Sequence, residues 1–177
     1  MCARDVRPAV ATTRLILRGP TAADVAPMAE LANDLGVAGA LARMPFPYTA
    51  EHATEGLARM AAYDPRRDVA FAVEHRDFGF IGMLGFHERE PRRPEVGYWL
   101  GRPFWGRGYA TEALAAGLRW AAQDWGRNAI WAGHFADNPA SGQVLCKAGF
   151  LYTGDVAPQD CLARGRKVPS RKMVWLA

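Results

Sequence analysis

The stretch over residues 95–125 constrains the fold of this chain more than any other part of the sequence. An apolar, β-rich run (95–100) leads into a loop that contains Gly106 and Gly108, and an amphipathic helix is predicted over about 109–125. The expected buried stripe of this helix consists of Ala110, Leu114, Leu118, Ala121 and Trp125. A strand that turns directly into such a helix needs a sheet to join and a sheet face for the helix to cover.

The rest of the chain supplies further strands and helices around this unit. The segments with strand character are 13–18, 69–74, 80–86, 95–100, 128–135, 151–154 and 172–176. The segments with helix character are 25–33, 50–63, 109–125 and 138–147. The order β-α-α-β-β-β-α-β-α-β-β predicts an α/β (α+β) fold, in which one domain over residues 1–177 has a mixed seven-stranded sheet with helices on both faces. The charged segment 155–171 is expected to be a connection.

The composition is that of an ordinary globular protein, with half of the residues hydrophobic. No apolar run is long enough to cross a bilayer, and the first residues (1–8) lead into no apolar stretch of a secretory signal, so a cytoplasmic location is expected. Cys2, Cys146 and Cys161 are too few and too widely spaced for a disulfide framework or a zinc site, and Cys146 is expected to be buried. The net charge of +4 comes from scattered basic residues, which suits an anionic cofactor better than nucleic acid.

The loop before the long helix is suited to bind a phosphate group. The first amides of a helix have no intrahelical acceptor, and the helix dipole adds partial positive charge there. Gly106 and Gly108 allow an anion to approach the backbone, and Arg102 and Arg107 can add charge at the rim. The loop lacks the Gly-Lys-Ser/Thr of a Walker A loop, and Thr111 stands where a dinucleotide fingerprint has its third glycine. A plain connection between two elements is the alternative.

The residues Trp-Gly-Arg-Gly-Tyr-Ala-Thr-Glu-Ala (105–113) resemble motif A of the GNAT acetyltransferases. The closest resemblance is to the branch that acetylates ribosomal-protein N-termini (Rim-type), whose pattern also appears in 13–18, 95–100, 138–141 and 147–150. These blocks span nearly the whole chain in the family's order. The resemblance implies the GNAT fold, with a mostly antiparallel sheet, and acetyl-CoA as the cofactor.

The resemblance also implies the function and the partners. The chain is expected to be an N-acetyltransferase in which an amine attacks acetyl-CoA directly in a ternary complex. The acceptor is expected to be a peptide N-terminus, as in ribosomal proteins, or a small amine, without direct contact to nucleic acid or membrane and with a possible homodimer. A CoA-binding regulatory module without turnover is the alternative function, and no metal site is expected.

The cofactor-binding residues implied by the resemblance are Val96, Gly97, Tyr98, Trp105, Gly106, Arg107, Gly108, Tyr109, Ala110, Thr111, Asn138, Ser141 and Lys147. The amides over 105–111 are expected to bind the CoA pyrophosphate. The strand 96–98 is expected to pair with the pantetheine arm, opened from the next strand by a bulge near Gly97. Pro103 stands where the family loop often has Gln or Arg, and it removes one donor from the loop.

Glu95, Asn138 and Ser141 are the residues expected to serve the chemistry. Glu95 is either the base, acting directly or through water, or a solvated charge at the end of a strand. Asn138 is predicted to cap a helix and to contact the pantetheine arm, while Ser141 is predicted to assist the leaving thiolate, with Tyr152 as the alternative for that role. Backbone amides over 96–98 are the expected oxyanion donors. His87 and His134 are expected to be structural.

Overall fold

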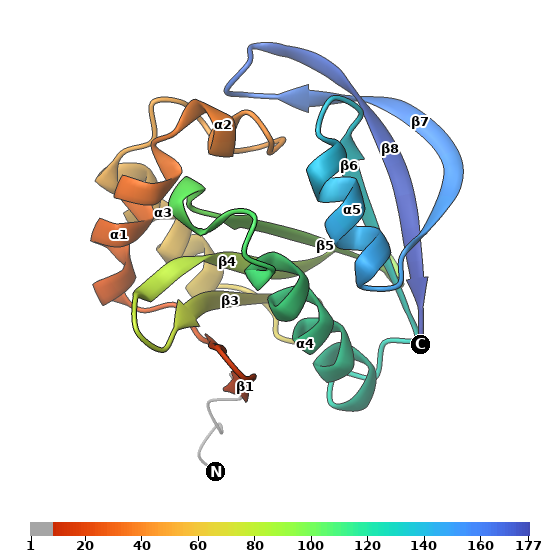
Figure 1. The fold of residues 1–177 in the computed structure, drawn as a ribbon, viewed down its shortest axis with the longest axis horizontal. Helices are drawn as coiled ribbons and strands as arrows, with labels where there is room; N and C mark the ends of the chain where they lie inside the picture. The colour runs from red at the N-terminus through yellow and green to blue at the C-terminus, as the bar shows by residue number, and fades with distance from the viewer. Residues whose placement is uncertain (1–8) are drawn as a thin grey trace.

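One sheet forms the frame on which every other element is mounted. The computed structural model describes residues 9–177 and places their eight strands in the order β1-β2-β3-β4-β5-β6-β8-β7 (Figure 1). The strands are β1 (Val10–Ala11), β2 (Leu15–Arg18), β3 (Asp68–His75), β4 (Gly79–Glu90), β5 (Arg93–Leu100), β6 (Ala129–Phe135), β7 (Leu151–Cys161) and β8 (Arg166–Leu176). The pair β5–β6 is parallel and every other neighbouring pair is antiparallel, which confirms the predicted mixed sheet.

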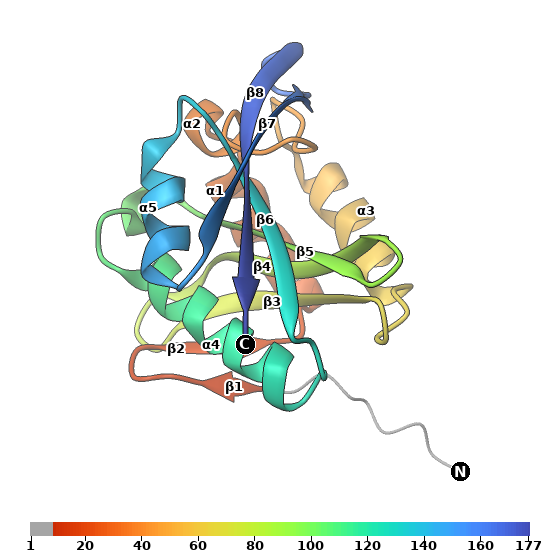
Figure 2. The same ribbon diagram turned by 90° about the vertical axis from the view of Figure 1, so that its right-hand side faces the viewer.

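Helices cover both faces of this sheet, as predicted. The helical elements are η1 (Ala22–Asp24), α1 (Val25–Ala32), α2 (Leu35–Ala38), α3 (Ala50–Ala61), η2 (Arg102–Phe104), α4 (Tyr109–Gln123) and α5 (Pro139–Lys147), where η marks a 3-10 helix. Helices α4 and α5 pack on one face of the sheet and α1 and α3 on the other, and Figure 2 shows α5 and α3 on opposite sides. No helix within residues 9–177 is both long and apolar enough to cross a membrane.

The main core lies between the sheet and α4. Its largest fully buried side chains include Phe71, Phe86, Leu114, Leu118 and Ile130. A smaller cluster under α1 and α3 contains Met28, Ala53, Phe80 and Met83. The long helix can approach β4 closely because Gly117 has no side chain, since a Cβ there would stand 2.6 Å from Leu84 Cδ2.

The predicted stripe of α4 is correct at its centre and incomplete at its ends. Leu114, Leu118 and Ala121 are buried, whereas Ala110 and Trp125 are only half-buried and Trp125 lies beyond the last helical residue. The stripe is also wider than predicted. Its further buried members are Tyr109, Ala113, Ala116, Gly117 and Trp120.

The largest departure from the predicted elements is the length of β7 and β8. The segment 155–171, expected to be a connection, is mostly strand, and only residues 162–165 form the turn between β7 and β8. Strand β7 is the outermost strand of the sheet, and most of its side chains are exposed, so no alternation of apolar and polar residues marked it. Its Pro158 pairs with Pro169 of β8, a residue type that edge strands tolerate.

Two short elements were also missed. The two-residue β1, which pairs Val10 with Leu17, raises the strand count from seven to eight. The four-residue α2 is too short for a periodic pattern, and it forms because Asp34 accepts hydrogen bonds from the amides of Gly36 and Val37.

The sheet opens between β5 and β6. These parallel strands share one paired position, Glu95 with Trp131, while β5 stays paired with β4 as far as Leu100 and β6 stays paired with β8 as far as Phe135. In Figure 2 β5 runs across the molecule and β6 runs nearly upright, so the two strands diverge. The expected bulge near Gly97 is wrong. Gly97 is in regular register with Gly85, and the irregularity of the β4–β5 pair lies between Glu88 and Glu90.

The buried carboxylate of Asp24, just before α1, links this helix to strand β2. Asp24 is 2% exposed and accepts hydrogen bonds from both terminal nitrogens of Arg18 (2.8 Å each) and from the amide of Thr21 (2.7 Å). Arg18 also pairs with Glu74 of β3. Burial by itself would raise the pKa of Asp24, but the hydrogen bonds from Arg18 and Thr21 outweigh it and hold the pKa below its usual range.

We expect Asp24→Asn to lower the free energy of unfolding by about 3 kcal/mol at pH 7, because it leaves Arg18 without its buried counter-charge. A lowered native pKa gives stability that is complete above the ordinary carboxyl pKa of about 4 and is lost as the pH falls further. The difference between the two proteins should therefore shrink below about pH 4. Urea denaturation at pH 7 and pH 3.5 measures it, with Asp160→Asn, an exposed carboxylate of β7, as the control. An equal loss at both pH values would contradict the assignment.

Candidate functional site

The start of α4 forms an open cradle of backbone amides. Gly106 (φ +71°) and Gly108 (φ +79°) both adopt the left-handed conformation that favours glycine. The helix begins with the hydrogen bond from the Glu112 amide to the Gly108 carbonyl (3.0 Å), and no side chain caps the preceding amides. The amides of Tyr109, Ala110 and Thr111 therefore lack intrahelical acceptors. Such an arrangement favours an anion at the helix start.

The residues just before the cradle are already engaged with the protein. The Trp105 indole donates to the Leu100 carbonyl (2.7 Å), and the Arg102 guanidinium lies over the Trp105 ring at 5.1 Å. Arg102 also forms two hydrogen bonds of 2.7 Å with Asp34, which hold the pKa of that carboxyl at about 2. The charge of Arg102 is thus balanced within the protein. Pro103 lies in η2 and supplies no amide donor.

The opening between β5 and β6 is lined by backbone groups. The Gly101 amide donates to the Ile81 carbonyl of β4 (2.9 Å), so alternation along β5 directs the backbone groups of Tyr98 and Leu100 away from β4, toward β6. By the same rule Val96 faces β6, whereas Gly97 faces β4. The backbone of an amide-containing ligand could pair with the groups that face the opening.

The facing edge of β6 completes this row of groups. The Ala136 amide donates to the Pro169 carbonyl of β8 (2.8 Å), so the backbone of Gly133 and Phe135 faces β5. The Phe135 carbonyl already accepts from the Asn138 amide at 2.9 Å. In residues 9–177 no strand pairing joins β5 to β6 beyond Glu95 and Trp131.

Ser141 and Tyr98 meet on the α5 side of the opening. Asn138 caps α5 as predicted, because its side-chain oxygen accepts from the Ser141 amide (3.2 Å), and Pro139 occupies the first turn. The Tyr98 hydroxyl lies 2.9 Å from Ser141 Oγ. Burial raises the pKa of Tyr98 to about 12, although the hydrogen bond with Ser141 acts in the opposite direction. The Tyr98 phenol therefore stays protonated. Its side chain was not among the groups predicted for the chemistry.

Glu95 lies on the other face of β5. Side chains alternate along a strand, and Tyr98 packs with the α4 cluster while Trp99 packs with the α1 and α3 cluster. Glu95 shares the face of Trp99, so the structure does not bring it beside Ser141. Its side chain is 36% exposed and lies 3.5 Å from Arg89 Nε.

A shallow pocket of about 200 Å³ surrounds Glu95. Its charged side chains are balanced, with three acids and three bases: Glu90, Glu95, Asp155, Arg89, Arg93 and Lys172. Glu95 is thus a half-exposed charge near the start of β5 that also lines a pocket, and its role as the base stays a prediction.

Tyr152 is paired with His134 rather than with Ser141. The Tyr152 hydroxyl lies 3.0 Å from His134 Nε2, and His134 Nδ1 lies 2.8 Å from the Phe135 carbonyl. A carbonyl can only accept, so in the neutral ring Nδ1 carries the proton and Nε2 accepts from Tyr152. This arrangement makes Ser141 the better placed of the two candidates for assisting the leaving thiolate.

His87 packs against Tyr63, and burial holds the pKa of His87 below its usual range.

A second cavity, of about 450 Å³, lies on the side of α5 away from Ser141. Its lining includes Pro139, Cys146, Lys147, Tyr152 and Arg171. Cys146 is exposed here, so its predicted burial is wrong. The neighbouring Leu145 takes the core position, and one residue further along a helix turns by about 100°. Cys161 is the buried cysteine, and Cys2 lies outside the described residues.

The segment around α2 joins the two halves of the sheet above the opening (Figure 1). At one end Asp34 pairs with Arg102, which follows β5. At the other end Arg164 Nε donates to the Gly39 carbonyl (2.7 Å) and the Leu162 amide donates to the Ala42 carbonyl (3.1 Å). We call residues 34–42 the α2 bridge. At the second end the bridge is held through its own backbone carbonyls, at Gly39 and Ala42, and such contacts leave no pattern in the sequence.

Comparisons with known proteins agree with this geometry. A family model described as an acetyltransferase (GNAT) domain matches residues 14–151. An uncharacterized N-acetyltransferase of Bacillus subtilis (strain 168), YoaA, is 34% identical over 97 residues, which are 53% of this chain and 55% of that protein. The ribosomal-protein-serine acetyltransferase of Escherichia coli (strain K12) is 34% identical over 76 residues, 42% of each chain. The chain thus spans about half the length of these relatives.

A solved structure resembles the fold over almost its whole length. It is the RimL ribosomal L7/L12 alpha-N-protein acetyltransferase in complex with coenzyme A, with a TM-score of 0.84 and 19% identity over 96% of this chain and 98% of that one. At this identity the likeness establishes the fold.

We expect Gly106→Ala to weaken the binding of CoA, the ligand that the sequence predicts for the cradle, by about tenfold or more, which corresponds to about 1.4 kcal/mol. The added methyl group would occupy open space where an anion must approach. Gly79→Ala is a matched control, since Gly79 has φ +72°, has the same open surroundings and is the first residue of β4, away from the cradle. Both variants should lose about 1–2 kcal/mol of unfolding free energy from left-handed strain. Calorimetric titration with CoA measures the affinities. Equal affinities of the two variants for CoA would contradict the binding of CoA at the cradle.

Proposed function

Since this chain belongs to the acetyltransferase (GNAT) domain family, we propose that it is an acetyl-CoA-dependent N-acetyltransferase whose acceptor is the α-amine of a peptide N-terminus. One observation carries the proposal, namely that the cradle at the start of α4 lies beside the opening between β5 and β6. Two named acetyltransferase relatives support the activity, and the ribosomal-protein-serine acetyltransferase among them supports the acceptor class. A cytoplasmic location and a homodimer stay predictions.

The geometry suits CoA in two places at once. The pyrophosphate would accept hydrogen bonds from the amides over 106–111, including those at the unsatisfied start of α4, whereas the Trp105 amide already donates to the Arg102 carbonyl (3.2 Å). The pantetheine arm carries two amides, and it would enter the opening and pair with the backbone groups of Tyr98 and Gly133. Asn138, at the α5 cap, would contact the same arm. Bound in this way, the thioester would reach the Ser141 hydroxyl.

The proposed reaction is a direct attack of the amine on the thioester. The neutral amine nitrogen forms a bond to the acetyl carbon, and the carbonyl becomes an oxyanion that the Tyr98 amide stabilises, since Val96 lies beside the paired position of Glu95 and Trp131. The carbon–sulfur bond then breaks and the thiolate leaves with a hydrogen bond from Ser141, whose hydroxyl is held by the Tyr98 phenol. Before the attack the ammonium form of the amine gives one proton to Glu95, directly or through water, and after it the nitrogen loses a second proton, which passes to the leaving thiolate through Ser141.

The positions of Glu95 and Ser141 on opposite faces of β5 support a ternary complex. CoA would occupy the side of α4 and α5, and the acceptor would approach from the side of α1 and α3. The two substrates would meet in the opening, where β5 and β6 are not paired. No covalent enzyme intermediate is needed.

The charges around Glu95 favour a peptide over a polyamine. An ammonium group can pair with the acids of the pocket, while its three bases can pair with the carbonyl and carboxylate groups that follow in a peptide. A polyamine carries cations only and would meet those bases without compensation.

A panel of amines with thiol-release detection tests the acceptor. We expect peptides with a free N-terminus to exceed spermidine in kcat/KM by about tenfold or more, since the difference needs only one extra ion pair of about 1.4 kcal/mol. The same peptides with acetylated N-termini are the control and should not react. Preference for spermidine would refute the acceptor class. CoA binding without transfer to any amine would refute the activity and favour a regulatory module.

Replacing Glu95 by Gln should lower kcat at pH 7 by about a hundredfold, the usual effect of losing a general base. The KM for acetyl-CoA should change little, because Glu95 lies on the acceptor side. The deficit should shrink above about pH 9, where a peptide α-amine (pKa about 8) is already neutral. Glu55→Gln, on the exposed face of α3, is the control. An unchanged rate would remove Glu95 from the mechanism.

A further inference from the structure

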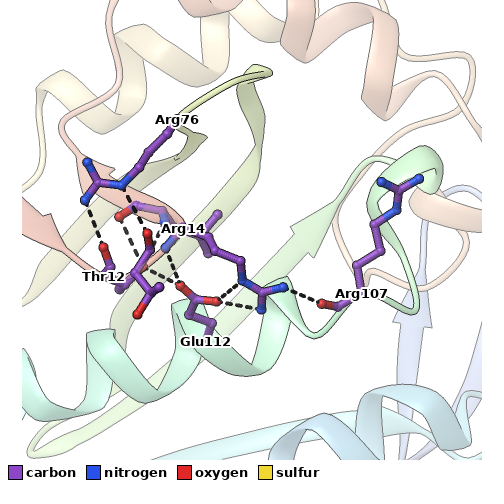
Figure 3. A network of polar contacts seen from close by, with 7 residues as sticks. Thr12, Arg14, Arg76, Arg107 and Glu112 are labelled. Atoms are coloured by element: carbon purple, nitrogen blue, oxygen red, sulfur yellow. Dashed lines mark hydrogen bonds and ion pairs between the residues drawn. The ribbon is translucent and has the colours of Figure 1, made fainter.

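Glu112 lies in the first turn of α4, immediately after the cradle, and its carboxylate is held by the segment before β2 (Figure 3). One carboxylate oxygen accepts from Thr12 Oγ1 (2.6 Å) and from the Arg14 amide (2.9 Å). The other oxygen lies 2.6 Å from both Nε and Nη2 of Arg14. The glutamate side chain is only 18% exposed. It is therefore fully engaged by residues about a hundred positions away in the sequence.

Arg14 contacts the loop of the cradle as well as the Glu112 carboxylate. Its Nη1 donates to the carbonyl of Arg107 (3.0 Å), and its guanidinium lies over the Tyr109 ring at 4.5 Å. The planar fork of arginine makes both contacts at once, which the point charge of lysine cannot do. Arg14 thus connects a fixed carboxylate of α4 to one peptide group of the cradle.

The orientation of that peptide group follows from its planarity. In a trans peptide the carbonyl of Arg107 and the amide of Gly108 point in opposite directions. Because Arg14 binds the carbonyl, the Gly108 amide points away from Arg14. The peptide lies between the α-carbons of Arg107 and Gly108, and Gly108 allows many backbone conformations. Without Arg14 the peptide could therefore rotate and turn its carbonyl toward an incoming anion.

Electrostatics gives the pair a second effect. A carboxylate so close to the helix start would repel a bound diphosphate. Burial by itself would raise the pKa of Glu112, but the hydrogen bonds from Thr12 and Arg14 outweigh it and keep the group ionised. The cation of Arg14 compensates this charge, and the pair presents no net charge to the cradle.

We propose that the Arg14–Glu112 pair is a clamp that holds the Arg107–Gly108 peptide with its amide turned toward the diphosphate of the donor. The proposal rests on the proposed function in taking CoA as the ligand. Arg14 is a positioning residue, because it acts through the loop. Its effect is confined to the diphosphate end of the donor and does not extend to the thioester.

The test compares two acetyl donors, acetyl-CoA and S-acetylpantetheine, which lacks the diphosphate. We expect Arg14→Gln to raise the KM for acetyl-CoA and the Kd for CoA by about tenfold, the effect of losing one charge-assisted amide contact. The kcat with acetyl-CoA and the kcat/KM with S-acetylpantetheine should stay within about twofold of wild type. Arg14→Lys should fail to restore the KM.

Arg76→Gln is the matched control. Arg76 donates to the carbonyls of Thr12 (2.9 Å) and Thr13 (3.2 Å), so it supports the same segment without touching the loop. This variant should keep the wild-type KM for both donors. A similar rise in KM would show that any loosening of the segment suffices, and it would overturn the clamp.

Equal losses with both donors, or an unchanged Kd for CoA in Arg14→Gln, would also overturn the proposal. If Arg14→Gln does not fold, Glu112→Gln tests the same pair from the other side and should show the same donor dependence. If the wild-type protein binds CoA but acetylates no amine, the proposed function fails, whereas the Kd values for CoA and pantetheine still decide on the clamp.

Discussion

The single paired position between β5 and β6 is the constraint on which the rest of the site depends. Two parallel strands that stay paired only at Glu95 and Trp131 must leave backbone groups without partners along both edges. Each strand is held from its outer side, β5 by β4 and β6 by β8, so the opening persists without closing into a ladder. The structure thus maintains unsatisfied hydrogen-bonding groups at its centre, which is costly unless a ligand or water satisfies them.

In the proposed reaction, the elements on the two sides of the opening bind different substrates. On one side, α4 and α5 contribute helix starts, a glycine loop and the Tyr98–Ser141 pair, all suited to an anionic donor with a thioester end. On the other side, balanced charges and Glu95 suit an amine that carries further polar groups. The same strand, β5, serves both sides, because alternate residues face opposite layers and its backbone lies between them.

Local patterns were enough to predict the strand, loop and helix over 95–125, the Asn138 cap and the mixed sheet, because each rests on neighbouring residues. The failures have a common origin in long-range or surface effects. Strand β7 lies at the sheet edge with most of its side chains exposed, and its neighbour β8 also buries few side chains, so the pattern of both resembled a loop. The exposure of Cys146 depends on which helix face the sheet covers. The Tyr98–Ser141 contact joins residues 43 positions apart, which no local pattern encodes.

The α2 bridge has a consequence for the order in which this chain can assemble. Gly39 is bound by Arg164, 125 residues later, whereas the cradle contacts of Arg14 are complete once Glu112 has been made. During synthesis from the N-terminus, the contacts of the cradle can therefore form while the α2 bridge still lacks its partner in the turn between β7 and β8. A nascent chain at that stage would have a place for the nucleotide end of its cofactor before the two halves of its sheet were joined above the opening.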